Sequence, residues 1–411
     1  MKILHVNYSD SKGGAAIACS RLVEALNENF TKSDLIVCEK KEDRKYRTLN
    51  QFENNTDLVL HKLKKYLSIN IKNIIGAKNI YKDSISIFNS GLAKKINNLD
   101  YDVINLHWIC NEMISIEEIK KIKKPKVWTV VDMWPFTGSS HYTTNNFYKY
   151  HNQKFDKNFL FNIENWVLSR KQKNFDKDIV VVCISNWLSN LAKESNVFRE
   201  NRIFTVPCTI DHTKWTPISK EASRNHLKFE KNKKYFLFSA YNGIADHRKG
   251  FDLLLDSLKL LKINRNDFSV VILGNTNGLD EFKKIYDFNY IVYDKHFNDD
   301  HEALKLIYSA CDIFIMPSRI EAFGQIVLEA GACELPCLTF KTIGAADIID
   351  HKVDGYLADY LDIGDLSRGI NFFLNEDNHA RISKNIRKKI NEKFSYDVVA
   401  KQYEKIYAGL K

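Results

Sequence analysis

The stretch SRIEAFGQIVLEAGACELPC, residues 318–337, sets two glutamates, Glu321 and Glu329, on either side of seven mostly small or apolar residues. It follows the apolar run IFIM, which ends at Pro317, and good helix formers follow Gly324. We therefore expect a buried strand, a loop and then a helix that begins near Gly324. A strand, a loop and a helix in this order are typical of a parallel α/β sheet.

Helical geometry constrains where the two carboxylates can lie. In one uninterrupted helix, eight residues turn by roughly 800°, which would leave Glu321 and Glu329 about 80° apart around the axis. If Glu321 instead lies in the loop and Glu329 in the second helical turn, both can border one pocket at the helix N-terminus. The free N–H groups at that end favour a phosphate.

The same alternation of strands and helices extends outward in both directions. From KYFLFSAYN at residue 234 to CLTF at residue 340 it forms one set, and from KILHVNY at residue 2 to IVVVCIS at residue 185 it forms another. Residues 51–98 fit the pattern least and read as basic helices. We predict two doubly wound α/β domains, joined near the irregular stretch 201–217. The predicted bounds are residues 1–207, completed by a C-terminal helix at 395–411, and residues 208–394.

Composition and charge narrow the classes of function. The chain has 411 residues, 44% of them hydrophobic, which is enough for two cores. The net charge of +10 arises from 61 basic against 51 acidic residues, so it is only a weak sign of an anionic partner. Nucleic acid, a nucleotide and an acidic membrane surface all stay open on this criterion.

The eight cysteines and the N-terminus bear on the compartment. No cysteine pair forms a CxxC, and most lie in apolar runs, which disfavours both a disulfide framework and a metal centre. The N-terminus MKILHVNYSD lacks the apolar core of a signal peptide, and no uncharged run approaches the roughly 20 residues of a membrane span. We expect a cytoplasmic protein that is neither exported nor membrane-spanning.

With its two glutamates, the opening stretch resembles the E-x7-E motif of family 4, the retaining nucleotide-sugar glycosyltransferases of GT-B fold. That resemblance implies two Rossmann-like domains facing a cleft. It also implies that Glu321 contacts hydroxyls of the donor sugar and that Glu329 holds the ribose. Gly324, Gln325 and Phe323 of the same segment would belong to the donor site.

Two further segments resemble donor-binding parts of that family. In ADHRKGFDLLLDSL, residues 245–258, Lys249 matches the lysine that clamps the donor diphosphate. A fixed cation would stabilise the charge of the departing diphosphate. The family's upstream arginine is not found in FSAYNGIAD, so Arg248 or Arg319 would supply that charge. Gly13 and Gly14 match the glycine loop of the first domain, where a bare backbone can approach a phosphate.

The segments VINLHWI and KVWTVVDMWPFTGSSHY resemble a narrower group, the glycosyltransferases of colanic acid, capsule and O-antigen assembly. His107 and Trp108 match one strand end of that group, and Asp132 and Trp134 match another. These four residues are expected on the acceptor side. Val131 stands where the group has a histidine. The segment AADIID, residues 345–350, resembles a further glycine loop of the family, of whose glycines this chain has only Gly344.

Other motifs are excluded or weighed against plainer explanations. The D-x-D of Asp100 and Asp102 precedes a strand instead of following one, and no P-loop, HExxH or GxSxG occurs. The stretches HKLKKYLSINIKNIIGAK and EEIKKIKKPK interleave lysines with apolar residues, as interfacial helices do. A solvated helix face is the favoured interpretation of each, with peripheral contact to an anionic inner membrane as the alternative.

The resemblance as a whole predicts a hexosyltransferase. It would transfer a hexose-type sugar from a UDP- or GDP-sugar to a lipid-linked oligosaccharide in bacterial surface-polysaccharide synthesis, with no metal, no cofactor and no nucleic acid. Two alternatives stay open at this point. One is a GT-B sugar-nucleotide epimerase, and the other is a degenerate member that binds a nucleotide sugar or a partner transferase without catalysis.

Overall fold

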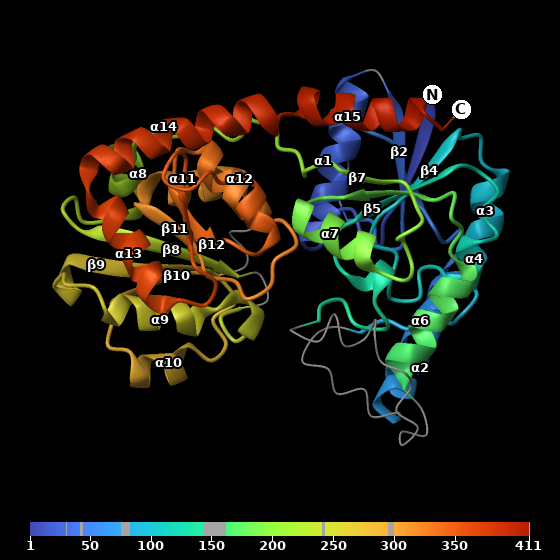
Figure 1. Ribbon diagram of the computed structural model, residues 1–411, viewed down its shortest axis with the longest axis horizontal. Coiled ribbons are helices and arrows are strands. Elements are labelled where there is room, and N and C mark those ends of the chain that lie inside the picture. The colour runs from blue at the N-terminus through green and yellow to red at the C-terminus, as the bar shows by residue number, and fades with distance from the viewer. Residues whose placement is uncertain are drawn as a thin grey trace. The chain divides into compact units, whose positions relative to one another are not determined.

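The computed structural model describes residues 1–29, 31–41, 44–74, 83–143, 162–240, 243–294 and 300–410. The chain divides into two compact units (Figure 1), which are described separately here. Unit 1 comprises residues 1–209 and 399–411, and unit 2 comprises residues 210–398.

Unit 1 is built around a parallel sheet of seven strands in the order β3-β2-β1-β4-β5-β6-β7. Its central strands are buried on both faces, which is why they read as continuous apolar runs such as VVVC. The strands are β1 (Lys2–Val6), β2 (Lys32–Val37), β3 (Thr48–Asn50), β4 (Val103–Leu106), β5 (Lys126–Val130), β6 (Val180–Cys183) and β7 (Ile203–Thr205). The helical elements are α1 (Gly14–Glu28), α2 (Asn55–Ile74), α3 (Leu92–Asn98), α4 (Ile116–Ile119), η1 (Trp134–Phe136), α6 (Ile163–Asn174) and α7 (Asn186–Glu194).

Unit 2 repeats the design with a parallel sheet of six strands in the order β10-β9-β8-β11-β12-β13. The strands are β8 (Lys234–Ala240), β9 (Phe268–Gly274), β10 (Tyr290–Tyr293), β11 (Ile313–Met316), β12 (Cys337–Phe340) and β13 (Tyr356–Ala358). The helical elements are α8 (Lys220–Leu227), η2 (His247–Lys249), α9 (Phe251–Lys259), η3 (Arg265–Asp267), α10 (Leu279–Ile285), α11 (His301–Ala310), α12 (Gln325–Ala332), η5 (Gly344–Asp347), α13 (Ile363–Leu374) and α14 (Glu376–Lys393). In both units the strand order reverses beside the first strand, which is the point where doubly wound sheets bind ligands.

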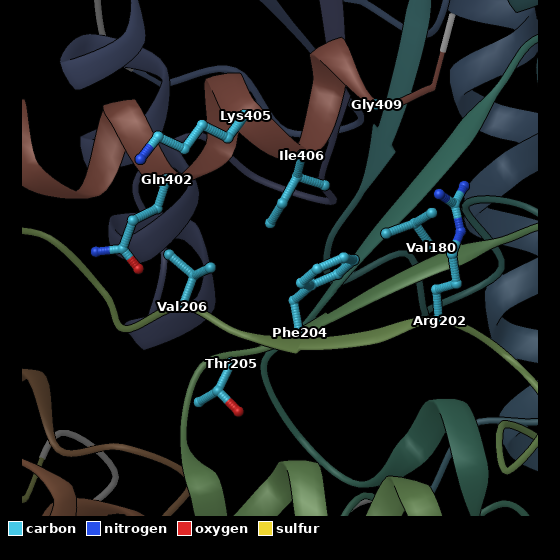
Figure 2. A pocket seen from close by; sticks show the side chains of 9 residues that line it. All are labelled: Val180, Arg202, Phe204, Thr205, Val206, Gln402, Lys405, Ile406 and Gly409. Atoms are coloured by element: carbon cyan, nitrogen blue, oxygen red, sulfur yellow. The ribbon is translucent and has the colours of Figure 1, made fainter.

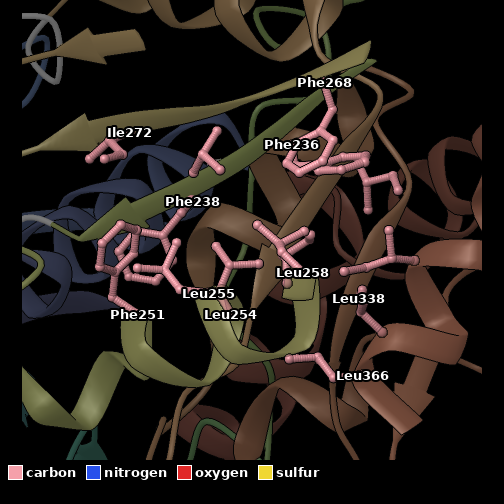
Figure 3. Packing of buried hydrophobic residues seen from close by; sticks show 14 of the residues in the cluster. Phe236, Phe238, Phe251, Leu254, Leu255, Leu258, Phe268, Ile272, Leu338 and Leu366 are labelled. Atoms are coloured by element: carbon pink, nitrogen blue, oxygen red, sulfur yellow. The ribbon is translucent and has the colours of Figure 1, made fainter. Parts of the chain in front are cut away.

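The core of unit 2 shows why α9 forms where it does. Its apolar residues recur at helical spacing, so Phe251, Leu254, Leu255 and Leu258 share one face and pack under the sheet (Figure 3). Phe238 of β8 lies against Phe251, with ring centroids 4.9 Å apart. This packing holds the N-terminus of α9, and the lysine just before it, against the sheet.

Helix α15 (Tyr396–Ala408) begins in unit 2 and ends in unit 1. In unit 1 two of its tyrosines reach polar groups of the central strands. The Asn105 amide donates to the Tyr407 hydroxyl at 2.7 Å, and the hydroxyls of Thr129 and Tyr403 lie 3.1 Å apart. The end of the chain is therefore part of the core of unit 1.

The observed units and elements lie close to the predicted ones. The contacts place the boundary between Thr209 and Ile210, two residues beyond the predicted 207, and keep residues 395–398 with unit 2. Two helices, α2 and α3, occupy most of the described part of residues 51–98. The loop and helix around the two glutamates are confirmed: Glu321 lies in the loop, and α12 begins at Gln325 after Gly324.

Candidate functional site

Lys249 and Glu321 form the centre of the predicted donor site in unit 2. The Lys249 ammonium lies 2.6 Å from Glu321 Oε2, although the two residues are 72 positions apart in the sequence. Burial alone would raise the pKa of Glu321, but the charge and hydrogen bond of Lys249 hold that pKa below its ordinary value. Glu321 is therefore an anion at neutral pH, held in place by a cation from another element.

A glycine and an arginine fix the loop that carries Lys249. Gly250 has φ 69°, and a Cβ on it would meet the carbonyl oxygen of Pro317 at 2.0 Å. The Arg319 guanidinium makes two hydrogen bonds to the Asp252 carboxylate, at 2.8 and 2.5 Å, and a third to the His247 carbonyl oxygen at 2.8 Å. The Lys249 loop is thus tied to the end of β11, directly before Glu321.

A second glycine supports Glu321 from the opposite direction. Gly344 donates its backbone N–H to the Glu321 carbonyl oxygen at 2.8 Å. A Cβ on Gly344 would lie 1.9 Å from the carbonyl oxygen of Ala322, so only glycine allows this approach. The weak motif match at residue 344 therefore marks a backbone contact that positions the glutamate loop.

Glu329 lies in the second turn of α12, buried among side chains of unit 2. The hydroxyl of Tyr308, on α11, donates to Glu329 Oε2 at 3.0 Å. Tyr308 is itself buried and packs against Trp215, with ring centroids 5.9 Å apart. This contact orients one carboxylate oxygen of Glu329.

The other predicted donor residues differ in what their side chains contact. The Arg248 guanidinium forms an ion pair with Asp246 at 2.6 Å. Phe323 is buried and packs against Phe394, so its side chain belongs to the core. Gln325 is the first residue of α12, where backbone N–H groups lack partners within the helix. Of the predicted cations, Lys249 is the one paired with the motif glutamate.

The glycine loop of unit 1 lies directly before helix α1. Gly13 has φ 89° and precedes α1, which begins at Gly14. A Cβ on Gly13 would meet no atom within 4 Å, so the positive φ, not crowding, is what requires glycine. The backbone is open to approach at this helix N-terminus.

The predicted acceptor residues Trp108 and Asp132 meet in a network at the ends of β4 and β5. The Trp108 indole N–H donates to Asp132 Oδ2 at 2.9 Å, and His141 Nδ1 lies 2.6 Å from the same oxygen. Burial would raise the pKa of Asp132, but the His141 imidazole holds it below its ordinary value. The backbone N–H of Trp134 donates to Asp132 Oδ1 at 3.0 Å. Both carboxylate oxygens of Asp132 are therefore occupied.

His141 also contacts Ser84, which gives a serine, a histidine and an aspartate in the order of a hydrolase triad. Ser84 Oγ lies 2.9 Å from His141 Nε2, and all three side chains are buried. A nucleophilic serine must be reachable by its substrate. Because Ser84 is enclosed, the three residues are better interpreted as a polar network that fixes the loop after β5.

Lys171 is the strongest contributor to this loop that the sequence did not reveal. Its side chain is fully buried on α6, and its ammonium donates to the carbonyl oxygens of Thr137 at 3.1 Å, Gly138 at 2.6 Å and Trp134. The ammonium also lies 3.8 Å from the centroid of the Trp134 ring. Burial lowers the pKa of Lys171 to about 7, while the nearby acidic groups Glu164 and Asp132 counter part of that shift.

His107 follows β4, and its side chain points into the core of unit 1. His107 Nε2 lies 2.9 Å from Nδ1 of His5, and burial lowers the pKa of His107 to about 3. Ligand atoms of His5, Cys19 and His107 lie within 4.8 Å of one another. In the part of the chain that the structure describes, these three residues form the one cluster of side chains that could hold a metal ion. The imidazoles already bond to each other, and burial raises the pKa of the Cys19 thiol, so we assign no ion to this group.

A cavity of about 310 Å³ lies elsewhere in unit 1, beside the edge strand β7 and helix α15 (Figure 2). Its lining is mainly apolar and includes Phe204, Val206 and Ile406, with Arg202 and Lys405 among the polar residues. None of the predicted site residues lines it. Nothing in the structure shows what occupies this cavity, and we give it no role.

The comparisons with known proteins agree with this fold and match a segment of unit 2. Residues 219–389 match the family model of group 1 glycosyl transferases. The chain is 16% identical to sucrose-phosphate synthase from Thermosynechococcus elongatus, with a TM-score of 0.71 over 100% of this chain and 99% of that one. It is 15% identical to Anabaena HepE, solved with UDP and glucose, with a TM-score of 0.68 over 100% of both chains.

The chain has the GT-B fold, and the expected resemblance to glycosyltransferases of this fold is confirmed for residues 219–389, which lie in unit 2. Among curated proteins, the capsular polysaccharide biosynthesis glycosyltransferase CapM of Staphylococcus aureus is 23% identical over 234 residues. That alignment covers 55% of this chain and 60% of CapM, less than two thirds of the relative. Among the described residues, none of the helices is long and apolar enough to cross a membrane.

Proposed function

We propose that the chain is a retaining glycosyltransferase that moves a hexose-type sugar from a UDP- or GDP-sugar to a lipid-linked oligosaccharide in bacterial surface-polysaccharide synthesis. The observation that carries the proposal is the 2.6 Å pair of Lys249 and Glu321 directly before the N-terminus of α12. It brings a cation and an anion together beside a helix N-terminus, the end of a helix that favours negative charge. The match to group 1 glycosyl transferases over the same residues and the name of CapM support it.

Each residue has a distinct task in this proposal. Lys249 and the N-terminus of α12 stabilise the charge that develops on the diphosphate as the sugar departs. Glu321 accepts hydrogen bonds from the donor sugar, and Glu329 accepts them from the ribose. Because Lys249 is paired with Glu321, a bound diphosphate would share the ammonium with that carboxylate, and the donor sugar would lie beside Glu321.

The acceptor attacks from the same face as the departing diphosphate, and no protein nucleophile takes part. Trp108 and Asp132 stay on the acceptor side of the proposal, while the burial of His107 suits it to holding β4 in place. The proposal includes no metal and no cofactor, since Lys249 and the helix N-terminus supply the positive charge. Val131 stands where the related enzymes have a histidine that contacts the donor sugar. A valine cannot make that contact, so another group must supply it.

Replacing the ribose ligand tests the site. Glu329→Gln keeps the size of the side chain but removes the charge, so we expect the KM for the donor to rise on the order of tenfold, the effect of losing one hydrogen bond to a charged group. Tyr308→Phe keeps the carboxylate and removes only the hydroxyl that orients it, so its KM should rise less. Initial rates with UDP-glucose and GDP-mannose, chosen by prior thermal-shift screening, give both values.

Three outcomes separate the rival functions. An unchanged KM and kcat in Glu329→Gln would show that the donor site is elsewhere. Conversion of the donor sugar to its epimer without any acceptor would identify an epimerase. Nucleotide binding by calorimetry without transfer to any lipid-linked acceptor would identify a non-catalytic binding protein.

A further inference from the structure

Helix α2 turns its polar face inward and its apolar face outward. On the inner side, Ser68 donates to Glu112 Oε1 at 2.7 Å, and the Lys72 ammonium donates to the Asp83 carbonyl oxygen at 2.7 Å. Lys65 reaches the Tyr8 hydroxyl at 3.0 Å on the same side. These hydrogen bonds help to set the rotation of this helix on unit 1.

The opposite side of α2 carries the apolar stripe, which we define as Val59, Leu60, Leu63, Tyr66 and Leu67. All five side chains are exposed, between 41% and 64% of their area. Their spacing of three and four residues puts them within about 120° of one another on a helical wheel. Ordinary amphipathic helices bury such a face, whereas in the part of unit 1 that the structure describes this stripe stays exposed.

The charges on α2 indicate the kind of partner. The helix has four lysines and a single acidic residue, Asp57, in its first turn. Lys65 and Lys72 bond to unit 1, and the Lys64 ammonium donates to the Asn89 carbonyl oxygen at 2.7 Å, which leaves Lys62 on the outer side. Lys62 and Lys64 lie roughly 100° to either side of Leu63, so they border the apolar stripe on both edges. An apolar stripe between lysines matches the boundary of an anionic lipid bilayer, with acyl chains below and phosphate headgroups beside the cations.

We propose that α2 docks unit 1 on an anionic lipid bilayer, with the apolar stripe inserted between the headgroups and Lys62, at its edge, beside the phosphates. A second copy of the chain fits less well, because two such helices face to face would oppose lysine with lysine. The other basic stretch, residues 117–126, differs, since its apolar residues Ile119 and Ile122 are buried. This inference does not depend on the donor chemistry of unit 2.

A charge in the stripe tests the proposal against a matched control. Leu63 and Leu260 are both 51% exposed, the first on α2 and the second on unit 2. Leu63→Glu should weaken binding to vesicles of phosphatidylcholine with phosphatidylglycerol on the order of tenfold or more, because it removes buried carbon groups and adds an anion. Leu260→Glu should bind as the unaltered chain does. Flotation of the full chain with vesicles measures both.

The contribution of the lysine charge to vesicle binding is measured separately. Lys62→Glu should weaken binding about fivefold, and added salt should weaken the binding of the unaltered chain. Vesicles of phosphatidylcholine alone should bind it least. Thermal melting of each variant should match the unaltered chain, because the substituted side chains are exposed.

Two results would overturn the proposal. One is equal flotation of the unaltered chain and Leu63→Glu. The other is a dimer in light scattering that Leu63→Glu converts to a monomer, with no vesicle binding by either form, which would identify the stripe as a contact between copies. Donor turnover with a water-soluble acceptor reports on the proposed function separately, and Leu63→Glu should leave it unchanged.

Discussion

A single ion pair joins the two charged motifs of unit 2 at the scale of residues. Lys249 and Glu321 were each expected from the sequence, but their 2.6 Å contact was not. Local patterns placed Glu321 in a loop and Glu329 on a helix, because Pro317 and Gly324 mark the ends of those elements. Tyr308 and Lys171 were missed, since each acts through a contact between distant segments that leaves no local pattern.

Lys249→Met tests the role of the cation. We expect kcat/KM for the donor to fall on the order of a hundredfold or more, because a positioned charge at the leaving diphosphate acts mainly in the transition state. Lys259→Met is the matched control, since Lys259 lies on the neighbouring α9 and pairs with Asp256 near the surface. Steady-state rates compare the two variants. A similar loss in both would remove Lys249 from the proposed mechanism.

At the scale of elements, two glycines fix the turns that carry the predicted donor residues. Gly250 and Gly344 let two turns approach carbonyl oxygens closer than any side chain would permit. The sequence identified Gly250 through its neighbour Lys249 and gave Gly344 little weight. The alternating strand pattern predicted both sheets, because buried parallel strands are continuous apolar runs. It could not predict which helix face of α2 would stay exposed, since hydrogen bonds to Tyr8, Asp83 and Glu112 help to decide that.

Gly250→Ala tests the close approach of the Lys249 loop to β11. The new Cβ would lie 2.0 Å from the Pro317 carbonyl oxygen and would also need a left-handed backbone. We expect a loss of about 2 kcal/mol or more in the free energy of unfolding, from strain of that kind. Urea denaturation measures it. Gly409→Ala is the control, because its Cβ would have no neighbour closer than 3.6 Å, and a comparable loss there would contradict the explanation.

At the scale of the whole molecule, buried histidines couple folding to pH. Burial lowers the pKa of His107 to about 3 and that of His61 to about 4, and it lowers the pKa of His5 well below 6.5. As the pH falls, these histidines are protonated near their ordinary pKa of about 6.5 in the unfolded chain, but only at lower pH in the folded chain. The stabilisation of the fold is therefore complete above about pH 6.5 and is lost as the pH falls below it.

The free energy of unfolding should accordingly decrease between about pH 6.5 and about pH 4, by roughly 1.4 kcal/mol per pH unit for each such histidine. Urea denaturation across that range measures the slope. His107→Gln should flatten the slope, because glutamine takes up no proton, whereas His226→Gln, at an exposed position, should leave it unchanged. An equal slope in all three chains would contradict the assignment.

The path of α15 has a consequence for how the protein is made. Tyr403 and Tyr407 complete the core of unit 1, yet they are translated only after every residue of unit 2. The core of unit 1 therefore cannot be completed until a segment that is synthesised after unit 2 has left the exit tunnel. Its sheet must spend that interval with the polar groups of Asn105 and Thr129 without their tyrosine partners.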